Sequence, residues 1–452
     1  MLRRVLDQLL EGLTYLVLRG FFRTVEAVGL ERVPKDRPVL VVANHFYGFV
    51  DPVLLVYVLG RVPRFLAKAA LWRSVVARPF LALAGIVPVG SAGDGARGTR
   101  TTAAFARSSR VLRRNGLVAL FPEGTTHDVP RLAPLRTGAA RIALHARARG
   151  ARDLTILPIG LVYDDKLALR SRALARVGEP IDLDAMLGDL DVGAEIDESD
   201  REVVRGLTAL IEERLRAVSP DYRDMRQAAV LSRAAEIALR GPDSDGMVPL
   251  AARDELAQQL AHAPEDETDQ LIDAVGRYLL DLDVLGLRDH QLATTVGQRA
   301  LLGAVVTTAA QVVLLAPLAV LGFAVNVVPF LLTQTAGRAA AEPVSKGTTR
   351  MLVALAVFPA TWLALIWVVT RLTDPGWMGV VGIMVLAVVS AMATVYCLER
   401  LVRVGRAWRG RIALRERRAL LSEVRADRDR LVAAVTACQT TIADVHAGAP
   451  EP

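Results

Sequence analysis

Three long apolar stretches in the C-terminal third constrain the fold of this 452-residue chain more than any other feature. Residues 351–371 and 378–398 are each close to the ~20 residues that an α-helix needs to cross a bilayer. The first stretch, residues 301–333, is longer, and two prolines and an asparagine interrupt it. Because broken helices are tolerated in membranes where protein buries the backbone, we expect a broken or re-entrant element followed by two full membrane spans.

Basic residues after the last apolar stretch predict its orientation. Eight arginines and one acidic residue, Glu416, lie between Arg400 and Arg418. Cytoplasmic loops of membrane proteins carry an excess of Lys and Arg, so we expect this segment in the cytoplasm. If the N-terminal half of the chain is cytoplasmic as well, the number of crossings must be even. Two spans and a re-entrant hairpin meet this condition, and four crossings would also meet it.

The net charge of +7 conceals a strong partition along the chain. Residues 1–180 contain 28 basic and 13 acidic residues, whereas residues 181–300 contain 12 and 26. This partition disfavours a uniformly basic nucleic-acid binder, so we expect no nucleic-acid partner. Nearly all the basic residues are arginine, which suits bidentate recognition of phosphate, although a GC-rich genome would produce the same bias. The two cysteines exclude a disulfide scaffold and a cysteine-rich zinc cluster.

Changes in composition and periodicity divide the chain into five segments. Residues 1–30 predict an amphipathic helix, which either packs on the next domain or lies in a membrane interface. Residues 31–182 alternate β-rich and helical runs, which is typical of an α/β domain with a largely parallel sheet. Residues 183–300 predict an acidic helical insert, and residues 301–398 the membrane region. Residues 399–452 comprise a basic juxtamembrane segment and a terminal helix, whose roughly heptad apolar spacing suits either a homodimer contact or packing on the chain itself.

Within residues 31–182, the β-rich and helical runs are short and clearly separated. The expected strands are 39–43, 117–121, 154–163 and 174–177, and the expected helices are 53–59, 99–114 and 138–149. Functional sites in α/β domains tend to lie at the carboxyl ends of the strands. Two polar motifs follow two of these strands directly, and they are the candidates for chemistry.

The first motif places Asn44 and His45 directly after a strand, with Asp51 six residues beyond the histidine. Histidine is the side chain best suited to proton transfer near neutral pH. A carboxylate on its second ring nitrogen fixes the tautomer and stabilises the imidazolium, as in serine hydrolases. A serine nucleophile is not needed if the substrate brings its own hydroxyl. Alone, a His and an Asp six residues apart more often serve a structural role.

The second motif, Phe121-Pro122-Glu123-Gly124, follows the strand 117–121. Glu123 is placed to bind an acceptor hydroxyl, and Gly124 permits close approach of the backbone to a ligand. The helix 138–149 then offers free N–H groups for an anion. An ordinary strand-to-helix turn rarely requires these four residues in this order.

Together the two motifs resemble the PlsC-type glycerolipid acyltransferase family, which includes glycerol-3-phosphate and 1-acylglycerol-3-phosphate acyltransferases. The resemblance covers roughly residues 20–182. The interval from His45 to Asp51 is the longer one, found in the branch that includes fungal glycerol-3-phosphate acyltransferases. The Phe-Pro-Glu-Gly motif matches the family's third motif residue for residue, and Leu157-Pro158-Ile159-Gly160 resembles the fourth.

The resemblance implies an α/β acyltransferase domain with a central mixed, mostly parallel sheet flanked by helices. It implies transfer of a fatty acyl group from acyl-CoA or acyl-carrier protein to a hydroxyl of glycerol-3-phosphate or of a lysophospholipid such as 1-acylglycerol-3-phosphate. With the apolar spans and the arginines after them, we expect a bilayer-embedded protein, in a bacterial inner membrane, whose catalytic domain faces the cytoplasm. His45 would be the general base and Asp51 its orienting partner, with no metal and no cofactor. The residues expected to contact substrate are Asn44, Glu123, Gly124, Thr125, Arg136, Arg170 and Arg172.

Two departures from the family pattern concern the phosphate of the acceptor. The family's second motif usually ends in an arginine where this chain has Gly90, and many members have an arginine where it has Thr126. Other arginines must therefore bind the phosphate, or the acceptor is not a simple phosphomonoester. The candidates are Arg97, Arg100, Arg136, Arg170 and Arg172. The alternatives are a lysophospholipid acyltransferase or transacylase acting on another headgroup and a lipid-binding membrane scaffold without activity.

Overall fold

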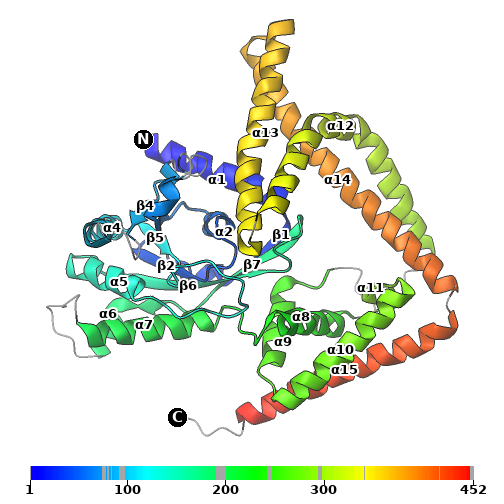
Figure 1. Cartoon of the computed structure of the whole chain (residues 1–452), viewed down its shortest axis with the longest axis horizontal. Coiled ribbons are helices and arrows are strands. Elements are labelled where there is room, and N and C mark those ends of the chain that lie inside the picture. Colours follow the sequence, from blue (N-terminus) through cyan, green and yellow to red (C-terminus); the bar gives the residue numbers. More distant parts are fainter. Residues whose placement is uncertain are drawn as a thin grey trace. The chain divides into compact units, whose positions relative to one another are not determined.

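The computed structural model describes residues 2–447 except 74–77, 79–80, 83, 91–96, 190–199, 242–246, 294–297, 341 and 417. The chain divides into two compact units (Figure 1). The first comprises Met1–Asp221 and Thr335–Val353, and the second comprises Tyr222–Gln334 and Ala354–Pro452. In each unit, segments that are distant in the sequence therefore share one body.

A mixed sheet forms the centre of the first unit. Its strand order is β1-β7-β6-β2-β5-β3-β4, and β8 pairs with β6. Neighbouring strands run parallel except at the β6–β7 and β6–β8 pairs, so the predicted mixed, mostly parallel sheet is confirmed. The strands are β1 (Phe22–Val28), β2 (Val39–Ala43), β3 (Arg64–Lys68), β4 (Val87–Val89), β5 (Leu117–Leu120), β6 (Thr155–Tyr163), β7 (Ser171–Val177) and β8 (Ile181–Asp182).

The central strands are those that the sequence predicts most clearly. Every residue of β2 and β5 is buried, because a parallel sheet covered by helices on both faces has no solvent-facing side. Each of the seven predicted strands and helices is present, with ends within three residues of the expected positions. The flanking helices are α1 (Leu2–Phe21), α2 (Val50–Leu59), α4 (Arg97–Leu112), α5 (Gly138–Ala148), α6 (Leu183–Asp189) and α7 (Arg201–Arg216).

The strands that the sequence does not predict are β1, β3, β4 and β8. The expected helix over residues 1–30 is too long, because α1 ends at Phe21 and the following residues pair in parallel with β7 as β1. The alternating polar residues of β1 resemble one face of a helix as much as one face of a strand. α1 packs on α2, and Leu18 is fully buried, whereas Leu9 stays 65% exposed.

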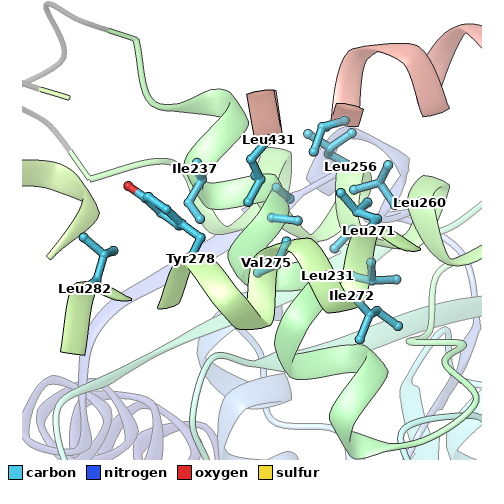
Figure 2. Close-up of a cluster of buried hydrophobic side chains, with 14 of the residues drawn as sticks. Leu231, Ile237, Leu256, Leu260, Leu271, Ile272, Val275, Tyr278, Leu282 and Leu431 are labelled. Carbon is cyan, nitrogen blue, oxygen red and sulfur yellow. The ribbon is translucent and has the colours of Figure 1, made fainter. Parts of the chain in front are cut away.

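A second hydrophobic core joins the helices after residue 221 to the terminal helix. It is built by α8 (Met225–Leu239), α9 (Leu250–Ala261), α10 (Glu265–Leu285), α11 (Asp289–Ala293) and α15 (Arg418–Ala447). Figure 2 shows Leu431 of α15 among side chains such as Leu256, Val275 and Tyr278. The predicted single insert over 183–300 is therefore divided, since α6 and α7 belong to the first unit. The apolar seam of α15 that suggested a dimer contact is covered by its own chain.

Three helices are long and apolar enough to cross a membrane among the residues that the structure describes: Leu302–Ala339, Ser345–Thr373 and Gly376–Gly405. They lie in α12 (Gln298–Ala339), α13 (Pro343–Thr373) and α14 (Gly376–Glu416). The two expected spans, 351–371 and 378–398, fall within α13 and α14. Close packing joins α12 to α14, because a Cβ at Gly322 would collide with the backbone of Ser390 and the Thr394 hydroxyl donates to the carbonyl of Ala319 at 2.8 Å.

Of the two forms expected for the first apolar stretch, a broken element is not found, because α12 is a single helix that contains both Pro317 and Pro329. The re-entrant form stays a prediction. Figure 1 shows that α12 instead bends over between its two ends, as expected for prolines inside a helix. Asn326 is buried there with its amide satisfied on both sides. Its Nδ2 donates to the carbonyl of Gly322 at 2.8 Å, and its Oδ1 accepts the indole N–H of Trp362 at 2.9 Å.

Candidate active site

The end of β2 and the start of α2 bring His45 and Asp51 together. His45 lies two residues beyond β2, and Asp51 lies in the first turn of α2. Gly48 adopts φ +55°, a left-handed conformation that favours glycine and lets the chain turn between them. The distance from His45 Nδ1 to Asp51 Oδ2 is 2.8 Å, so the pair predicted from the sequence is formed.

The surroundings of Asp51 fix the orientation of the histidine ring. Asp51 is 0% exposed, and its Oδ2 also accepts the backbone N–H of Tyr47 at 2.8 Å. Its Oδ1 accepts the hydroxyl of Tyr163 at 2.5 Å. These donors offset the cost of burying a carboxylate. With Nδ1 held by Asp51, Nε2 is the nitrogen of His45 that can accept a proton from a substrate.

Tyr163 is a site residue that the sequence reasoning missed. Burial and the neighbouring Asp51 raise the pKa of its hydroxyl well above the ordinary value, so Tyr163 remains a donor to that carboxylate. It is the last residue of β6, whose neighbour in the sheet is β2. The available signal was its position, because the carboxyl ends of these parallel strands lie at the same edge of the sheet.

The histidine ring itself lies in an aromatic and partly open setting. It stacks on Phe121 with ring centroids 4.1 Å apart, and its side chain is 18% exposed. Phe121 belongs to the second motif, so the two motifs are in direct contact. The ring is therefore accessible to a substrate, whereas Asp51 is shielded from solvent.

Asn44 does not face a substrate, contrary to the expectation. Its Nδ2 donates to the carbonyl of Leu161 at 2.9 Å, and its Oδ1 accepts the N–H of Leu161 at 2.6 Å. The side chain is 0% exposed. Asn44 thus continues the β2–β6 pairing beyond the end of β2 and fixes the backbone from which His45 projects.

Glu123 is likewise engaged by the protein. Its Oε1 accepts the backbone N–H of His45 at 2.7 Å, and its Oε2 accepts the N–H of Ala133 at 2.9 Å. Oε2 also lies against Nε2 of His127, and the residue is only 3% exposed. Glu123 therefore connects the second motif to the backbone of the first. The sequence had instead predicted that it contacts the acceptor.

Gly124 and Arg136 lie against each other at the second motif. Gly124 adopts φ +69°, and a Cβ there would be 2.7 Å from Nε of Arg136. The N–H of Arg136 donates to the carbonyl of Pro122 at 2.9 Å. Because Gly124 has no side chain, the exposed Arg136 lies across this loop, and Thr125 beside it is also exposed.

The structure does not offer Arg170 and Arg172 to a ligand. The Arg170 guanidinium donates to the carbonyl of Phe22 at 2.8 Å and to that of Arg19. Arg172 is 8% exposed, and its Nε donates to Asp164 at 3.1 Å. Both arginines serve the fold around β7, so the expectation that they bind phosphate is not supported. The side chains of Arg97 and Arg100 lie outside the described residues.

Lys166, in the loop between β6 and β7, is a second residue that the sequence reasoning missed. Its Nζ donates to the carbonyl of Phe46 at 3.2 Å and to Asp128 at 3.3 Å, and it lies over the Phe46 ring. The Phe46 ring also meets His127 edge-on at 5.1 Å. A lysine and a histidine thus lie beside the residue that follows His45. Lys166 is one of four lysines in the chain, which was the only signal.

No group of three His, Cys, Asp or Glu side chains lies together as metal ligands would among the described residues. A histidine with one nitrogen held by a buried carboxylate can act as a general base.

Comparison with known proteins gives this site a context. Residues 24–162 match the family model described as "Acyltransferase". The chain is 32% identical over 187 residues to "Glycerol-3-phosphate O-acyltransferase 2" of Saccharomyces cerevisiae, a match that covers 40% of this chain and 24% of that protein. It is 30% identical over 121 residues to "Glycerol-3-phosphate O-acyltransferase 1" of the same yeast, covering 26% and 16%. The matches therefore span about a quarter or less of the length of these relatives.

A solved structure also aligns with the chain. It is the crystal structure of the 1-acyl-sn-glycerophosphate acyltransferase PlsC from Thermotoga maritima. The alignment has a TM-score of 0.34 and 19% sequence identity, and it covers 48% of this chain and 80% of that one.

Proposed function

We propose that the whole chain is a membrane-bound O-acyltransferase of glycerolipid synthesis, because residues 24–162 match the family model described as "Acyltransferase". It transfers a fatty acyl group from a thioester donor, acyl-CoA or acyl-carrier protein, to a hydroxyl of glycerol-3-phosphate or 1-acylglycerol-3-phosphate. The observation that carries this proposal is the His45–Asp51 pair, with Asp51 buried and held by Tyr47 and Tyr163.

In the proposed reaction, His45 Nε2 accepts the proton of the acceptor hydroxyl as that oxygen attacks the thioester carbon. The bond from oxygen to the acyl carbon forms, the carbon–sulfur bond breaks, and the imidazolium returns the proton to the leaving thiolate. Asp51 stabilises the imidazolium while it exists. A general base of this kind contributes ~10²–10⁴ in rate. Glu123 contributes by fixing the backbone of His45.

We further propose that Arg136 binds the phosphate of the acceptor. Among the described arginines predicted as phosphate ligands, Arg136 alone combines an exposed side chain with a position against the Phe-Pro-Glu-Gly loop. Its guanidinium can form charge-assisted hydrogen bonds with phosphate oxygens. The names of the yeast relatives favour glycerol-3-phosphate as the acceptor. The replacement of two family arginines by Gly90 and Thr126 keeps a lysophospholipid with another headgroup as the second candidate.

The path of the chain supports a cytoplasmic catalytic domain with two crossings. Between β8 and α12, the described residues contain no helix apolar enough to cross, so α12 begins on the side of the catalytic domain. Residues 335–353, at its other end, belong to the catalytic unit, so α12 also ends on that side. α15 packs on α8 and α10, so α14 returns to the same side. In this arrangement only α13 and α14 would cross, and the positive-inside rule, applied to the arginines after α14, favours the cytoplasm for that side.

An acceptor panel tests the proposed function. Membranes containing the purified protein are incubated with labelled palmitoyl-CoA, or palmitoyl-carrier protein, and with glycerol-3-phosphate, 1-acylglycerol-3-phosphate or other lysophospholipids. We expect transfer to a phosphomonoester acceptor and its loss in the His45→Ala variant. Transfer to none of the acceptors, or full activity of His45→Ala, would refute the enzymatic proposal. Transfer only to a lysophospholipid with another headgroup would favour the second candidate.

A further inference from the structure

The first turns of helix α13 lie directly on the loop that carries the catalytic pair. The hydroxyl oxygen of Thr348 accepts the backbone N–H of Phe49 at 3.0 Å. Phe49 is the residue before α2, so this bond is made one residue before the helix that carries Asp51. Thr348 lies about 300 residues further along the chain, in a segment outside the matched acyltransferase region. Nothing in the motifs of that region predicts this contact.

Two glycines make the contact close. A Cβ at Gly347 would collide with the ring of Tyr47, with Cε2 as the nearest atom. A Cβ at Gly48 would collide with the hydroxyl oxygen of Thr348. The backbone of α13 and the catalytic loop therefore touch at positions where neither chain has room for a side chain. Such a fit leaves little freedom for the loop to move independently of the helix.

Tyr47 connects this contact to the catalytic pair. Its ring lies against Gly347, and its backbone N–H donates to Asp51 Oδ2 at 2.8 Å, the same oxygen that faces His45. The ring also meets Tyr163 edge-on at 5.1 Å. Displacement of the Tyr47 ring would accordingly move two of the groups that hold Asp51.

A third residue of α13, Arg350, contacts the loop between β6 and β7. Arg350 donates to the carbonyl of Leu167, in the β6–β7 loop whose Lys166 carbonyl accepts the hydroxyl of Tyr47. Lys166 in turn donates to the carbonyl of Phe46. The start of α13 thus contacts both loops that surround His45.

We propose that the start of α13 is part of the active-site support, with Gly347 and Thr348 as positioning residues for the His45–Asp51 loop. Acyl transfer then depends on how α13 is placed against this loop. Because α13 is long and apolar enough to cross the bilayer, it would support the active site as well as anchor the protein. This inference rests on the proposed acyltransferase function, but the geometry on which it depends does not require a particular acceptor.

The test compares Gly347→Ala with Gly382→Ala. Gly382 is a glycine of α14 where a Cβ would meet nothing within 4 Å, so it controls for a helical Gly→Ala change. Since a misplacement of about 1 Å can cost ~10²-fold in rate, we expect Gly347→Ala to lower kcat at least about tenfold. The KM for the acyl donor should change little, and Gly382→Ala should retain the kcat of the wild type.

A second arm separates positioning from general damage. In a Tyr47→Ala background the obstructing ring is gone, so adding Gly347→Ala should lower kcat by less than about twofold, a non-additivity expected only for residues in contact. Thr348→Ser should retain activity, whereas Thr348→Val, which loses the acceptor for Phe49, should lower kcat severalfold. Equal costs of Gly347→Ala in both backgrounds, or an unchanged kcat for Gly347→Ala and Thr348→Val, would overturn the inference.

A readout without substrate distinguishes this inference from the proposed function. The labelling rate of His45 by diethyl pyrocarbonate, followed by peptide mass spectrometry, reports how the loop presents the ring. We expect severalfold faster labelling in Gly347→Ala than in the wild type and in Gly382→Ala. If the wild type transfers no acyl group but this difference holds, the proposed function fails and the positioning role stands. An unchanged labelling rate in Gly347→Ala would overturn the positioning role.

Discussion

Replacing Asp51 by asparagine tests the arrangement around His45, because it removes the charge while keeping the shape of the side chain. The backbone N–H of Tyr47 can only donate, so it favours the amide oxygen at the Oδ2 position, where it lies 2.8 Å away. The Tyr163 hydroxyl, 2.5 Å from Oδ1, can accept as well as donate. It therefore provides a partner for the new NH₂ group. The amide oxygen still accepts the Nδ1–H of His45, so the tautomer with a free Nε2 is retained.

Asp51→Asn should consequently lower kcat because a charge is removed, while the tautomer of His45 is kept. In serine hydrolases the corresponding substitution leaves the wrong tautomer and lowers kcat by ~10⁴. Two opposite charges 4 Å apart attract by about 4 kcal/mol at an effective dielectric constant of 20, and the neutral amide oxygen retains part of that attraction for the imidazolium. A loss of about 3–4 kcal/mol corresponds to a fall in kcat of about 10²–10³-fold.

The assay is the initial rate of palmitoyl transfer from labelled palmitoyl-CoA by purified protein in membranes. Asp51→Asn, Tyr163→Phe and the double variant are compared with His45→Ala. In the double variant the amide NH₂ loses its partner, so we expect a further loss of at least about tenfold relative to Asp51→Asn, from the cost of an unsatisfied buried donor. The reasoning is refuted if Asp51→Asn is as inactive as His45→Ala and the added Tyr163→Phe makes no difference.

Three other substitutions test separate parts of the structure. Asn44→Ala leaves two buried backbone groups of Leu161 unsatisfied, so it should lower the free energy of unfolding by roughly 2–4 kcal/mol in a denaturant titration; a change below about 0.5 kcal/mol would contradict this. Arg136→Ala should raise the KM for a phosphate acceptor about 10–100-fold with the KM for acyl-CoA unchanged, whereas the exposed Arg141→Ala should not. Arg428→Ala removes a 2.8 Å ion pair with Asp289 and two hydrogen bonds to carbonyls of the α8 region. Because Asp289 keeps other partners, we expect a loss on the order of 2–3 kcal/mol in thermal unfolding, and no comparable loss for the exposed Arg425→Ala.

The parts of the fold that the sequence predicted are those with a strong local pattern. β2 and β5 are short runs of buried aliphatic residues, and apolar runs of this length are typical of buried strands. Two of the missed strands, β4 and β8, contain only three and two residues. The other two, β1 and β3, mix charged residues with apolar ones. The unbroken helix over residues 301–333 has another cause. Proline disfavours a helix locally, but an apolar segment in a membrane retains helical hydrogen bonding wherever it can, so α12 bends without breaking.

The candidate site divides along similar lines. His45, Asp51 and the Phe-Pro-Glu-Gly motif were found because residues that act together lie close in the sequence or at the ends of predicted strands. Arg170 was misjudged because an arginine in a sequence has the same appearance whether it binds phosphate or backbone carbonyls. Tyr163 and Lys166 were missed because each is a single residue without a motif.

By itself, the sequence determined that this chain has an α/β domain with a His–Asp pair at a strand end, and apolar helices able to enter a bilayer. These features depend on local composition and on short intervals between residues, and both can be read directly from the sequence. The tertiary structure alone decided that Asn44 and Glu123 fix the loop, that Tyr163 holds Asp51, and that Thr348 meets Phe49. Each of these contacts is made between segments that separate strands and helices bring together. Their geometry is set by packing, which does not appear in any local pattern.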